Sequence, residues 1–281
     1  MRGQNSRSAG GAVAMRSHYA ESRESARLSR GPGELEFYRT KELIARFLPR
    51  KRCVVLDVGG GPGAYAFWLA KQGHAVHLVD PVRLHVEQVR EACDLRKGVR
   101  LASATEGDAR DLKFKDEFAD AVLLLGPLYH LVKERDRVRA LAEARRVLKP
   151  GGWIFAAAIS KFASALDGLF RGFVKDGEFL KILRRDLKTG QHRNPTNHLE
   201  YFTTAFFHHP AELEKEFGRA GLEKPRLYGI EGPGWMLPNF GEFWSKTFLR
   251  ERLLEIVRAV ESEPTMVGQS AHVLAVGRKR K

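Results

Sequence analysis

Short apolar runs alternate with amphipathic stretches over most of the chain. The first five runs lie at 53–58, 74–79, 99–104, 119–125 and 153–159. Between them, apolar residues recur at helical spacing, as at Val82, Val86 and Val89. Strands that alternate with helices predict a parallel sheet wound by right-handed crossovers. Because the runs are apolar throughout, we expect helices to cover both faces of that sheet.

The segment before this alternation divides into two parts. Residues 1–16 are rich in Gly, Ser, Ala and Arg without periodicity, which predicts a flexible basic tail. Residues 17–50 place apolar side chains on a shared helical face, with a break at Gly31-Pro32-Gly33. We expect this second part to form a helical lid over an α/β core at 51–159.

The alternation stops after the fifth run. Residues 160–209 mix helical and polar patterns, and excursions of this length are often lids or binding loops. The remainder, 210–281, predicts a helix that begins at Pro210 and strands at 225–230 and 271–276 with a helical segment between them. We therefore expect an α/β, Rossmann-like sheet of seven strands, with an N-terminal helical cover and a mainly helical, substrate-binding insertion after the fifth strand.

The charge and composition limit the class of partner. A formal net charge of +14 brings nucleic acid, an acidic membrane surface and anionic substrates into consideration. Much of this charge is dispersed arginine, so we do not expect specific nucleic-acid binding. No apolar stretch reaches the roughly 20 residues of a membrane span. Cys53 and Cys93 fit core positions in a reducing compartment, and we expect a cytoplasmic protein without a membrane partner; a homodimer is left open.

A glycine-rich turn connects the first predicted strand to a helix. It reads Gly59-Gly60-Gly61-Pro62-Gly63, where Gly59, Gly61 and Gly63 let the backbone turn sharply and a ligand approach closely. Such turns serve dinucleotides, phosphates and sulfonium nucleosides alike. Ala64 stands where a phosphate-binding loop would have Lys, which argues against ATP hydrolysis. Asp57 before the turn would repel a pyrophosphate but favours a ligand that carries an ammonium group.

Two further carboxylates follow the next two strands. Asp80 ends the second run, where a carboxylate can accept hydrogen bonds from both ribose hydroxyls. Asp108 follows the third run. A helix cap or a turn is the alternative explanation for any one of these acids. It is a weaker explanation for Asp57, Asp80 and Asp108 together.

These motifs resemble those of the class I S-adenosylmethionine-dependent methyltransferases over residues 52–159, including the turn Lys149-Pro150-Gly151-Gly152 before the fifth strand. The resemblance implies S-adenosyl-L-methionine as cofactor and S-adenosyl-L-homocysteine as product, and an antiparallel last strand. It also implies that Asp57 serves the methionine amino group, Asp80 the ribose and Asp108 the adenine amino group. The expected cofactor site comprises Tyr19, Arg39, Asp57, Gly59, Gly61, Gly63, Asp80, Pro81, Asp108, Ala109 and Leu125.

The residues after the fourth strand face the methyl group in this family, and here they read Gly126-Pro127-Leu128-Tyr129-His130-Leu131. A similar stretch occurs in bacterial small-molecule methyltransferases, several of them from natural-product pathways. The Asn/Asp-Pro-Pro-Tyr/Phe tetrapeptide typical of base or glutamine N-methylation is absent from it. His130 could act as a general base or hydrogen-bond locally. Tyr129 could contact the acceptor or wall the adenosine pocket.

The lid and the insertion supply the remaining candidates. Tyr19 and Glu36 could close over the acceptor, and Arg39 could bind the methionine carboxylate, with ordinary helix packing as the alternative. Expected catalytic residues are His130, Tyr129 and Glu36. Expected substrate-binding residues are Tyr19, Tyr129, His192, Asn194, Tyr201, Phe206 and Trp235. The histidines of the insertion have no carboxylate at regular ligand spacing, so we expect no metal site.

Together these observations predict methyl transfer to O, N or C of a small, aromatic or heterocyclic metabolite. An RNA or protein methyltransferase is an alternative suggested by the basic charge, and it predicts a continuous basic surface at the pocket mouth. A non-catalytic S-adenosylmethionine-binding protein is a second alternative. A closed, aromatic-lined cavity would favour the small-molecule hypothesis.

Overall fold

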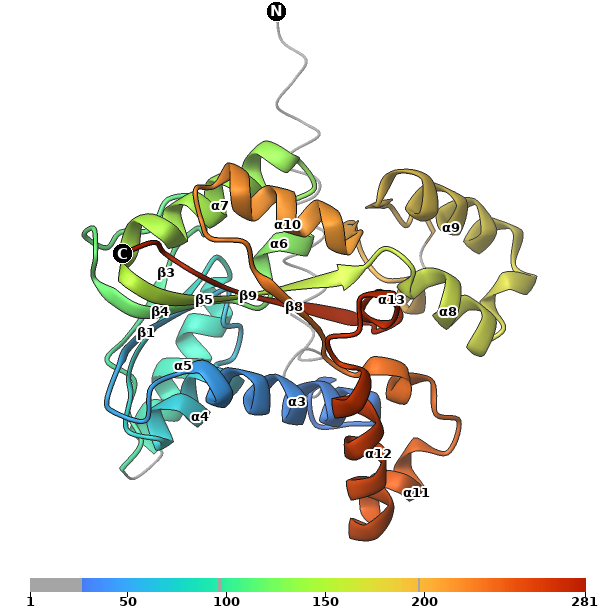
Figure 1. Cartoon of the computed structure of the whole chain (residues 1–281), viewed down its shortest axis with the longest axis horizontal. Coiled ribbons are helices and arrows are strands. Elements are labelled where there is room, and N and C mark those ends of the chain that lie inside the picture. The colour runs from blue at the N-terminus through green and yellow to red at the C-terminus, as the bar shows by residue number, and fades with distance from the viewer. Residues whose placement is uncertain (1–26, 96–97, 197) are drawn as a thin grey trace, which may run out of the picture.

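A computed structural model describes residues 27–95, 98–196 and 198–281 (Figure 1). Its centre is a parallel sheet in the order β3-β2-β1-β4-β5, continued by antiparallel β9 beside β5 and by β8 beside β9. The parallel strands are β1 (Val54–Val58), β2 (Ala75–Asp80), β3 (Ser103–Glu106), β4 (Ala119–Leu124) and β5 (Leu148–Ser160). The last two strands of this path are β8 (Arg226–Gly229) and β9 (His272–Arg278). The predicted α/β sheet and its antiparallel last strand are confirmed.

Helices cover both faces of the sheet, as the continuous apolar runs predict (Figure 1). One face packs on α3 (Pro32–Phe47), α4 (Ala64–Lys71) and α5 (Arg83–Leu95). The other packs on α7 (Glu134–Val147) and α10 (Pro210–Arg219). Neighbouring residues of β1 face opposite sides of the sheet. Val55 packs in the core on the side of α3, α4 and α5, and Leu56 packs in the core on the side of α7 and α10.

The insertion after β5 forms a compact helical unit at the end of that strand. Its elements are α8 (Ala163–Phe170), η1 (Phe173–Lys175), α9 (Gly177–Thr189), β6 (Gln191–His192), η2 (Leu199–Tyr201) and β7 (Ala205–His208). Ile159 and Ser160 pair with Phe207 and His208, so β7 fastens the insertion to the sheet. Phe179 and Ile182 give the insertion a small core of its own.

Between β8 and β9 the chain forms a second helical excursion. It contains η3 (Gly232–Met236), α11 (Phe240–Ser245), α12 (Thr247–Val260) and α13 (Pro264–Val267). Leu253 and Leu254 of α12 pack with Phe240 and with Leu35 of α3, so this excursion and the lid helix share one core. Within the described residues, no helix combines the length and apolarity that crossing a bilayer requires.

Two predicted strand boundaries are wrong. The third strand begins at Ser103 rather than at 99, because Val99 and Leu101 pack on the core from the loop that precedes it. The fifth strand begins at Leu148, before the predicted Lys149-Pro-Gly-Gly turn. The register shifts there, with Leu148 opposite Ala119 and Trp153 opposite Ala121, so the turn is absorbed as an irregularity within β5.

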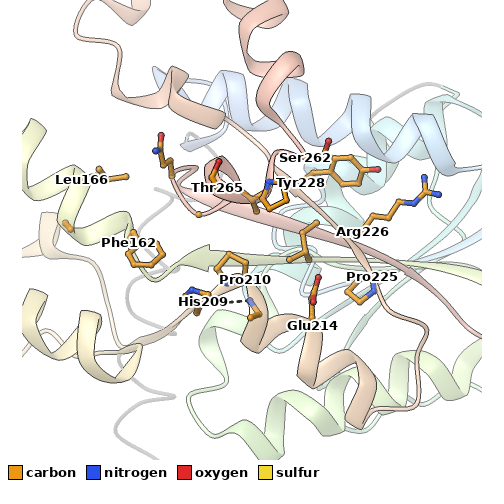
Figure 2. A pocket seen from close by; sticks show the side chains of 17 residues that line it. Phe162, Leu166, His209, Pro210, Glu214, Pro225, Arg226, Tyr228, Ser262 and Thr265 are labelled. Carbon is orange, nitrogen blue, oxygen red and sulfur yellow. Dashed lines mark hydrogen bonds between the residues drawn. The ribbon is translucent and has the colours of Figure 1, made fainter.

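A cavity of about 1000 Å³ lies on the side of the sheet where α8, α10, β8 and α13 meet (Figure 2). Its lining includes Phe162, Leu166, Pro210, Tyr228 and Thr265. None of the glycines of the turn after β1 lines it, nor do the three acids that follow the first strands. The cavity is therefore separate from the site built on those residues.

Candidate functional site

The glycine turn follows β1 and lies where three strand ends meet. Gly59, Gly61 and Gly63 all have positive φ, the region that glycine adopts without steric cost. The Gly59 N–H donates to the carbonyl of Val79 at 2.7 Å. A Cβ on Gly59 would lie 2.6 Å from Cγ of Pro127, at the start of the short helix α6 (Pro127–His130). Only glycine therefore lets the ends of β1, β2 and β4 approach this closely.

Asp57 is a buried carboxylate beneath this turn. It is 1% exposed, and its Oδ2 has no hydrogen-bond partner within the described residues. Burial and the neighbouring charge of Asp80 raise the pKa of Asp57 to about 7. A buried acid of this kind is stabilised by a cationic partner, so Asp57 fits a ligand that brings an ammonium group.

Asp80, the last residue of β2, organises the loops on either side of it. Its Oδ2 accepts the N–H of Gly61 at 2.8 Å. Its Oδ1 accepts the N–H of Val82 at 2.9 Å and lies 3.0 Å from Nδ1 of His85. The half-buried Pro81 follows directly. The turn role considered as an alternative is therefore present, and it brings the carboxylate against the glycine loop.

Asp108 follows β3 and forms a local ion pair. Nε of Arg110 lies 2.9 Å from Oδ1 and Nη2 lies 2.5 Å from Oδ2, and the Arg110 N–H donates to Oδ1 at 2.8 Å. These hydrogen bonds lower the pKa of Asp108. Ala109 is buried beside it, and Leu125 is half-buried after β4. The strand ends thus bring Asp57, Asp80 and Asp108 to one edge of the sheet.

Tyr129 and His130 in α6 lie at the same edge. Tyr129 is 6% exposed and packs with Ile159 at the end of β5 and with Ala205 and Phe207 of the insertion. The ring of His130 is 4.7 Å from that of Tyr129, centroid to centroid. Tyr129 therefore connects the end of β4 to the insertion.

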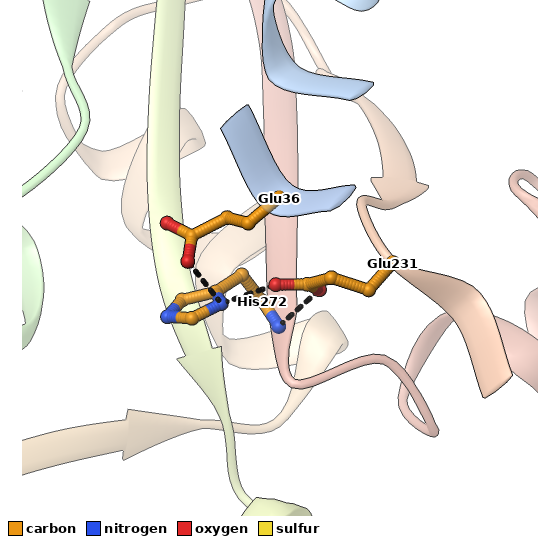
Figure 3. Close-up of side chains that lie close together, drawn as sticks. All are labelled: Glu36, Glu231 and His272. Atoms are coloured by element: carbon orange, nitrogen blue, oxygen red, sulfur yellow. Dashed lines mark hydrogen bonds and ion pairs between the residues drawn. The ribbon is translucent and has the colours of Figure 1, made fainter. Parts of the chain in front are cut away.

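Glu36 of α3 lies in a charged cluster with Glu231 and His272 (Figure 3), and Arg27 also pairs with it. Nη2 of Arg27 donates to Oε1 of Glu36 at 3.0 Å. Nδ1 of His272 is 2.6 Å from Glu231 Oε1 and 3.7 Å from Glu36 Oε2. Burial alone would lower the pKa of His272, but the carboxylates of Glu36 and Glu231 outweigh it and raise the pKa to about 9.

Sequence reasoning identified Glu36 but missed Glu231 and His272. Glu231 follows β8 and His272 opens β9, so the two residues lie far apart in the sequence. The available signal was topological: because β9 is antiparallel, its first residue lies beside Ile159 at the end of β5. The side-chain atoms of Glu36, Glu231 and His272 that could bind a metal ion lie within 4.8 Å of one another. Arg27 and Ser270, however, already hydrogen-bond to the two carboxylates.

Arg39 of α3 is committed to ion pairs in this structure. Its side chain is fully buried and pairs with Glu42 at 2.5 Å and with Glu261, which follows α12. These contacts join the lid helix to the second excursion. A role for Arg39 in binding the methionine carboxylate stays a prediction, and it would require Arg39 to leave Glu261. Tyr19 lies outside the described residues.

Three of the expected substrate-binding residues organise the insertion itself. His192 has partners at both ring nitrogens, Asp186 at 2.8 Å and the carbonyl of Tyr201 at 2.6 Å. The amide of Asn194 donates to the carbonyl of Phe202 at 2.9 Å. The hydroxyl of Tyr201 donates to Asp176 at 2.6 Å. Their side chains are thus occupied by contacts that hold the loop between α9 and β7.

The remaining expected aromatic residues, Phe206 and Trp235, lie in β7 and η3. Phe206 faces the guanidinium of Arg137, 3.6 Å from its ring centroid, whereas Phe207 packs on the side of Tyr129. The alternation of side chains along a strand separates these neighbours, so Phe207, and not the expected Phe206, packs with Tyr129. Trp235 is buried in η3, where its Nε1 donates to the carbonyl of Gln269 at 3.0 Å.

Comparison with known proteins places this geometry in context. A family model described as a methyltransferase domain matches residues 55–152. A ubiquinone/menaquinone biosynthesis C-methyltransferase from Acidiphilium cryptum is 36% identical over 208 residues, which are 70% of this chain and 79% of that protein. Other curated relatives match over shorter segments, 40% to 52% of their own length.

Solved structures share the fold at low sequence identity. A methyltransferase from Methanosarcina mazei has a TM-score of 0.56 and 16% identity, covering 85% of this chain and 97% of that chain. A phosphoethanolamine N-methyltransferase from Haemonchus contortus, solved with S-adenosylhomocysteine, has a TM-score of 0.53 and 17% identity, covering 87% of this chain and 53% of that chain.

Proposed function

The chain belongs to the class I S-adenosylmethionine-dependent methyltransferases, and from this premise we propose that it methylates a small aromatic or heterocyclic metabolite. The observation that carries the proposal is the position of Tyr129, which joins the end of β4 to the insertion at the edge that holds the glycine turn. The name of the Acidiphilium relative, which refers to quinone biosynthesis, supports an aromatic acceptor.

The cofactor, S-adenosyl-L-methionine, supplies a methyl group on a positively charged sulfur. In our proposal Asp57 pairs with the ammonium group, since its buried Oδ2 has no other partner in the described residues. Asp80 accepts the ribose hydroxyls after exchanging its hydrogen bond with Gly61. Asp108 and the backbone of Ala109 face the adenine. Gly59, Gly61, Gly63, Pro81 and Leu125 would contact the cofactor between these groups.

The acceptor would lie between α6, α3 and the insertion. Methyl transfer is an in-line displacement, so the chain must align two reactants and exclude water. Tyr129 and His130 would contact the acceptor from α6, and Glu36 would close over it from α3. The methylated atom, O, N or C, is set by how these side chains orient the acceptor.

One labelling experiment tests this function. The protein is incubated with methyl-labelled S-adenosylmethionine and a metabolite extract of its source, and labelled products are identified by mass spectrometry. We expect one small aromatic or heterocyclic product. An Asp80→Ala variant, which lacks the proposed ribose ligand, serves as control and should yield none. Labelled RNA or protein would instead support the macromolecular alternative, and tight cofactor binding without any product would support a binding protein.

A further inference from the structure

The imidazole of His272 is held at Nδ1 by the carboxylate of Glu231. Oε2 of Glu231 accepts the Ser270 hydroxyl at 2.7 Å and the backbone N–H of His272 at 3.0 Å. The Ser270 hydroxyl oxygen in turn accepts the N–H groups of Glu231 and Gly232 at 3.0 and 3.1 Å. These bonds fix the carboxylate, which holds its other oxygen 2.6 Å from Nδ1 of His272 (Figure 3).

A second carboxylate approaches the same nitrogen. Oε2 of Glu36 lies 3.7 Å from Nδ1, and Arg27 orients Glu36 from the far side. The hydrogen bond to Glu231 and the nearby negative charge of Glu36 keep a proton on Nδ1. The nitrogen that gains or loses a proton is therefore Nε2.

Nε2 of His272 points away from both carboxylates (Figure 3). Within the described part of the chain no hydrogen bond to it is recorded, and 17% of the side chain is exposed. The arrangement has the elements of a positioned general base: a carboxylate orients one ring nitrogen and leaves the other open to a reactant.

The cluster of His272, Glu231 and Glu36 lies beside the proposed acceptor site. His272 pairs directly with Ile159 across β9 and β5, and residues paired in this way project to the same face of a sheet. Ile159 packs against Tyr129. On the other side, burial and then the charge of Glu36 raise the pKa of Tyr65, the second residue of α4 after the glycine turn. The cluster thus adjoins Ile159, which contacts α6, on one side and Tyr65 of α4 on the other.

We propose that His272 is the base of the methyl transfer and that the acceptor carries an acidic hydroxyl group on an aromatic ring. The proposal rests on the small-molecule function proposed above. As the acceptor oxygen forms its bond to the methyl carbon, the carbon–sulfur bond breaks with its electron pair passing to sulfur. The hydroxyl proton moves to Nε2, and the imidazolium is stabilised by Glu231 and Glu36.

The proton affinity of His272 matches such an acceptor. The groups that face its ring are Glu36, Glu231 and, through Glu36, Arg27, and their combined effect gives a pKa of about 9. A phenol has a pKa of about 10, so the transfer of its proton to His272 is nearly balanced, and the neutral imidazole that accepts this proton becomes the main form only above about pH 9. An aliphatic alcohol is a far weaker acid and would hold its proton. We therefore expect activity to rise with pH up to about 9.

Nuclear magnetic resonance titration of the histidine rings tests, without any acceptor, whether Glu231 and Glu36 raise the pKa of His272. We expect His272 to titrate near pH 9 and Glu231→Gln to lower its pKa by about one unit or more. His209→Asn is the matched control, since His209 caps α10 and Asn is also a good cap. An ordinary pKa for His272 that does not respond to Glu231→Gln would overturn the proposal.

Kinetics then test the base itself, with simple phenols and 1,4-naphthohydroquinone as probes and S-adenosylhomocysteine release as readout. His272→Asn should lower kcat by a factor of about 10² to 10⁴ with cofactor affinity unchanged. Glu231→Gln should move the pH–rate inflection to lower pH, which covers the case that His272→Asn does not fold. Full activity of folded His272→Asn, or a wild type that binds the cofactor but turns over no phenol, would overturn the proposal. A wild type that binds no cofactor would instead refute the proposed function.

Discussion

The proposed cofactor side and the proposed acceptor side of this site are built in different ways. On the cofactor side, Asp57 lies near the end of β1, Asp80 ends β2 and Asp108 follows β3, and these three strands pair in a row. On the acceptor side, Glu36, Tyr129 and His272 come from α3, α6 and β9, which meet only because the last strand is antiparallel and the lid lies over it. The first arrangement is local and repeats a strand-turn pattern. The second depends on tertiary packing, and so it can vary without altering the first.

The largest expected effect is on protein stability, and it comes from Asp57 on the proposed cofactor side. Asp57 has a folded-state pKa of about 7, above the value of about 3.9 for a free Asp. The folded state therefore binds this proton more tightly, and the free energy of unfolding falls as pH rises from about 4 to 7. Asp57→Asn should raise the stability of the cofactor-free protein above pH 7, by at most about 4 kcal/mol, measured by thermal melts.

The same Asp57→Asn variant should bind S-adenosylmethionine more weakly, because the ammonium group loses its charged partner. His85→Asn, which changes a group behind Asp80, is a control for general disturbance of the loop. Equal melting temperatures for wild type and Asp57→Asn at pH 5 and pH 8 would contradict the buried, proton-binding carboxylate.

The next effect is measured on cofactor binding. Asp80→Ala removes the expected acceptor of the ribose hydroxyls and should weaken cofactor affinity by about 3 kcal/mol, since hydrogen bonds to a charged group contribute about 1.5–3 kcal/mol each. Calorimetry measures it directly, with exposed Asp111→Ala as the matched control. Unchanged affinity would remove Asp80 from the ribose site.

A smaller effect tests the acceptor side. His130→Ala should lower turnover about tenfold, the equivalent of one lost hydrogen bond of about 1.4 kcal/mol, while cofactor affinity stays the same. If His130 rather than His272 takes the proton, the loss should instead reach the range expected for a general base. Steady-state kinetics of His130→Ala beside His272→Asn therefore distinguish the two imidazoles.

The smallest effect compares two neighbours on β7. Phe207→Leu should raise KM for the acceptor severalfold because Phe207 packs on Tyr129, and exchanges between apolar side chains of this kind usually cost less than about 1.5 kcal/mol. Phe206→Leu removes a ring that faces Arg137 and should affect stability more than KM. Equal changes in KM for both variants would show that β7 does not position the acceptor.

The sequence by itself determined the sheet, its glycine turn and the three acids, because each is a local signal: an apolar run, a backbone that needs glycine, and a carboxylate near the end of a strand. It did not reveal that Asp80 also organises the glycine loop, since that contact joins residues 19 positions apart. The edge strand β3 was misplaced because half-exposed strands lack a continuous apolar run.

Only the tertiary structure decided which side chains come together at the proposed acceptor site. Arg39, His192 and Tyr201 have the right chemistry, but packing commits them to Glu261, Asp186 and Asp176. Glu231 and His272 carried no motif and come together through the pairing of β9 with β5 and β8. The physical reason is range: a strand end and its turn are fixed by adjacent residues, whereas a cluster assembled from a lid, a loop and the last strand exists only once the chain is folded.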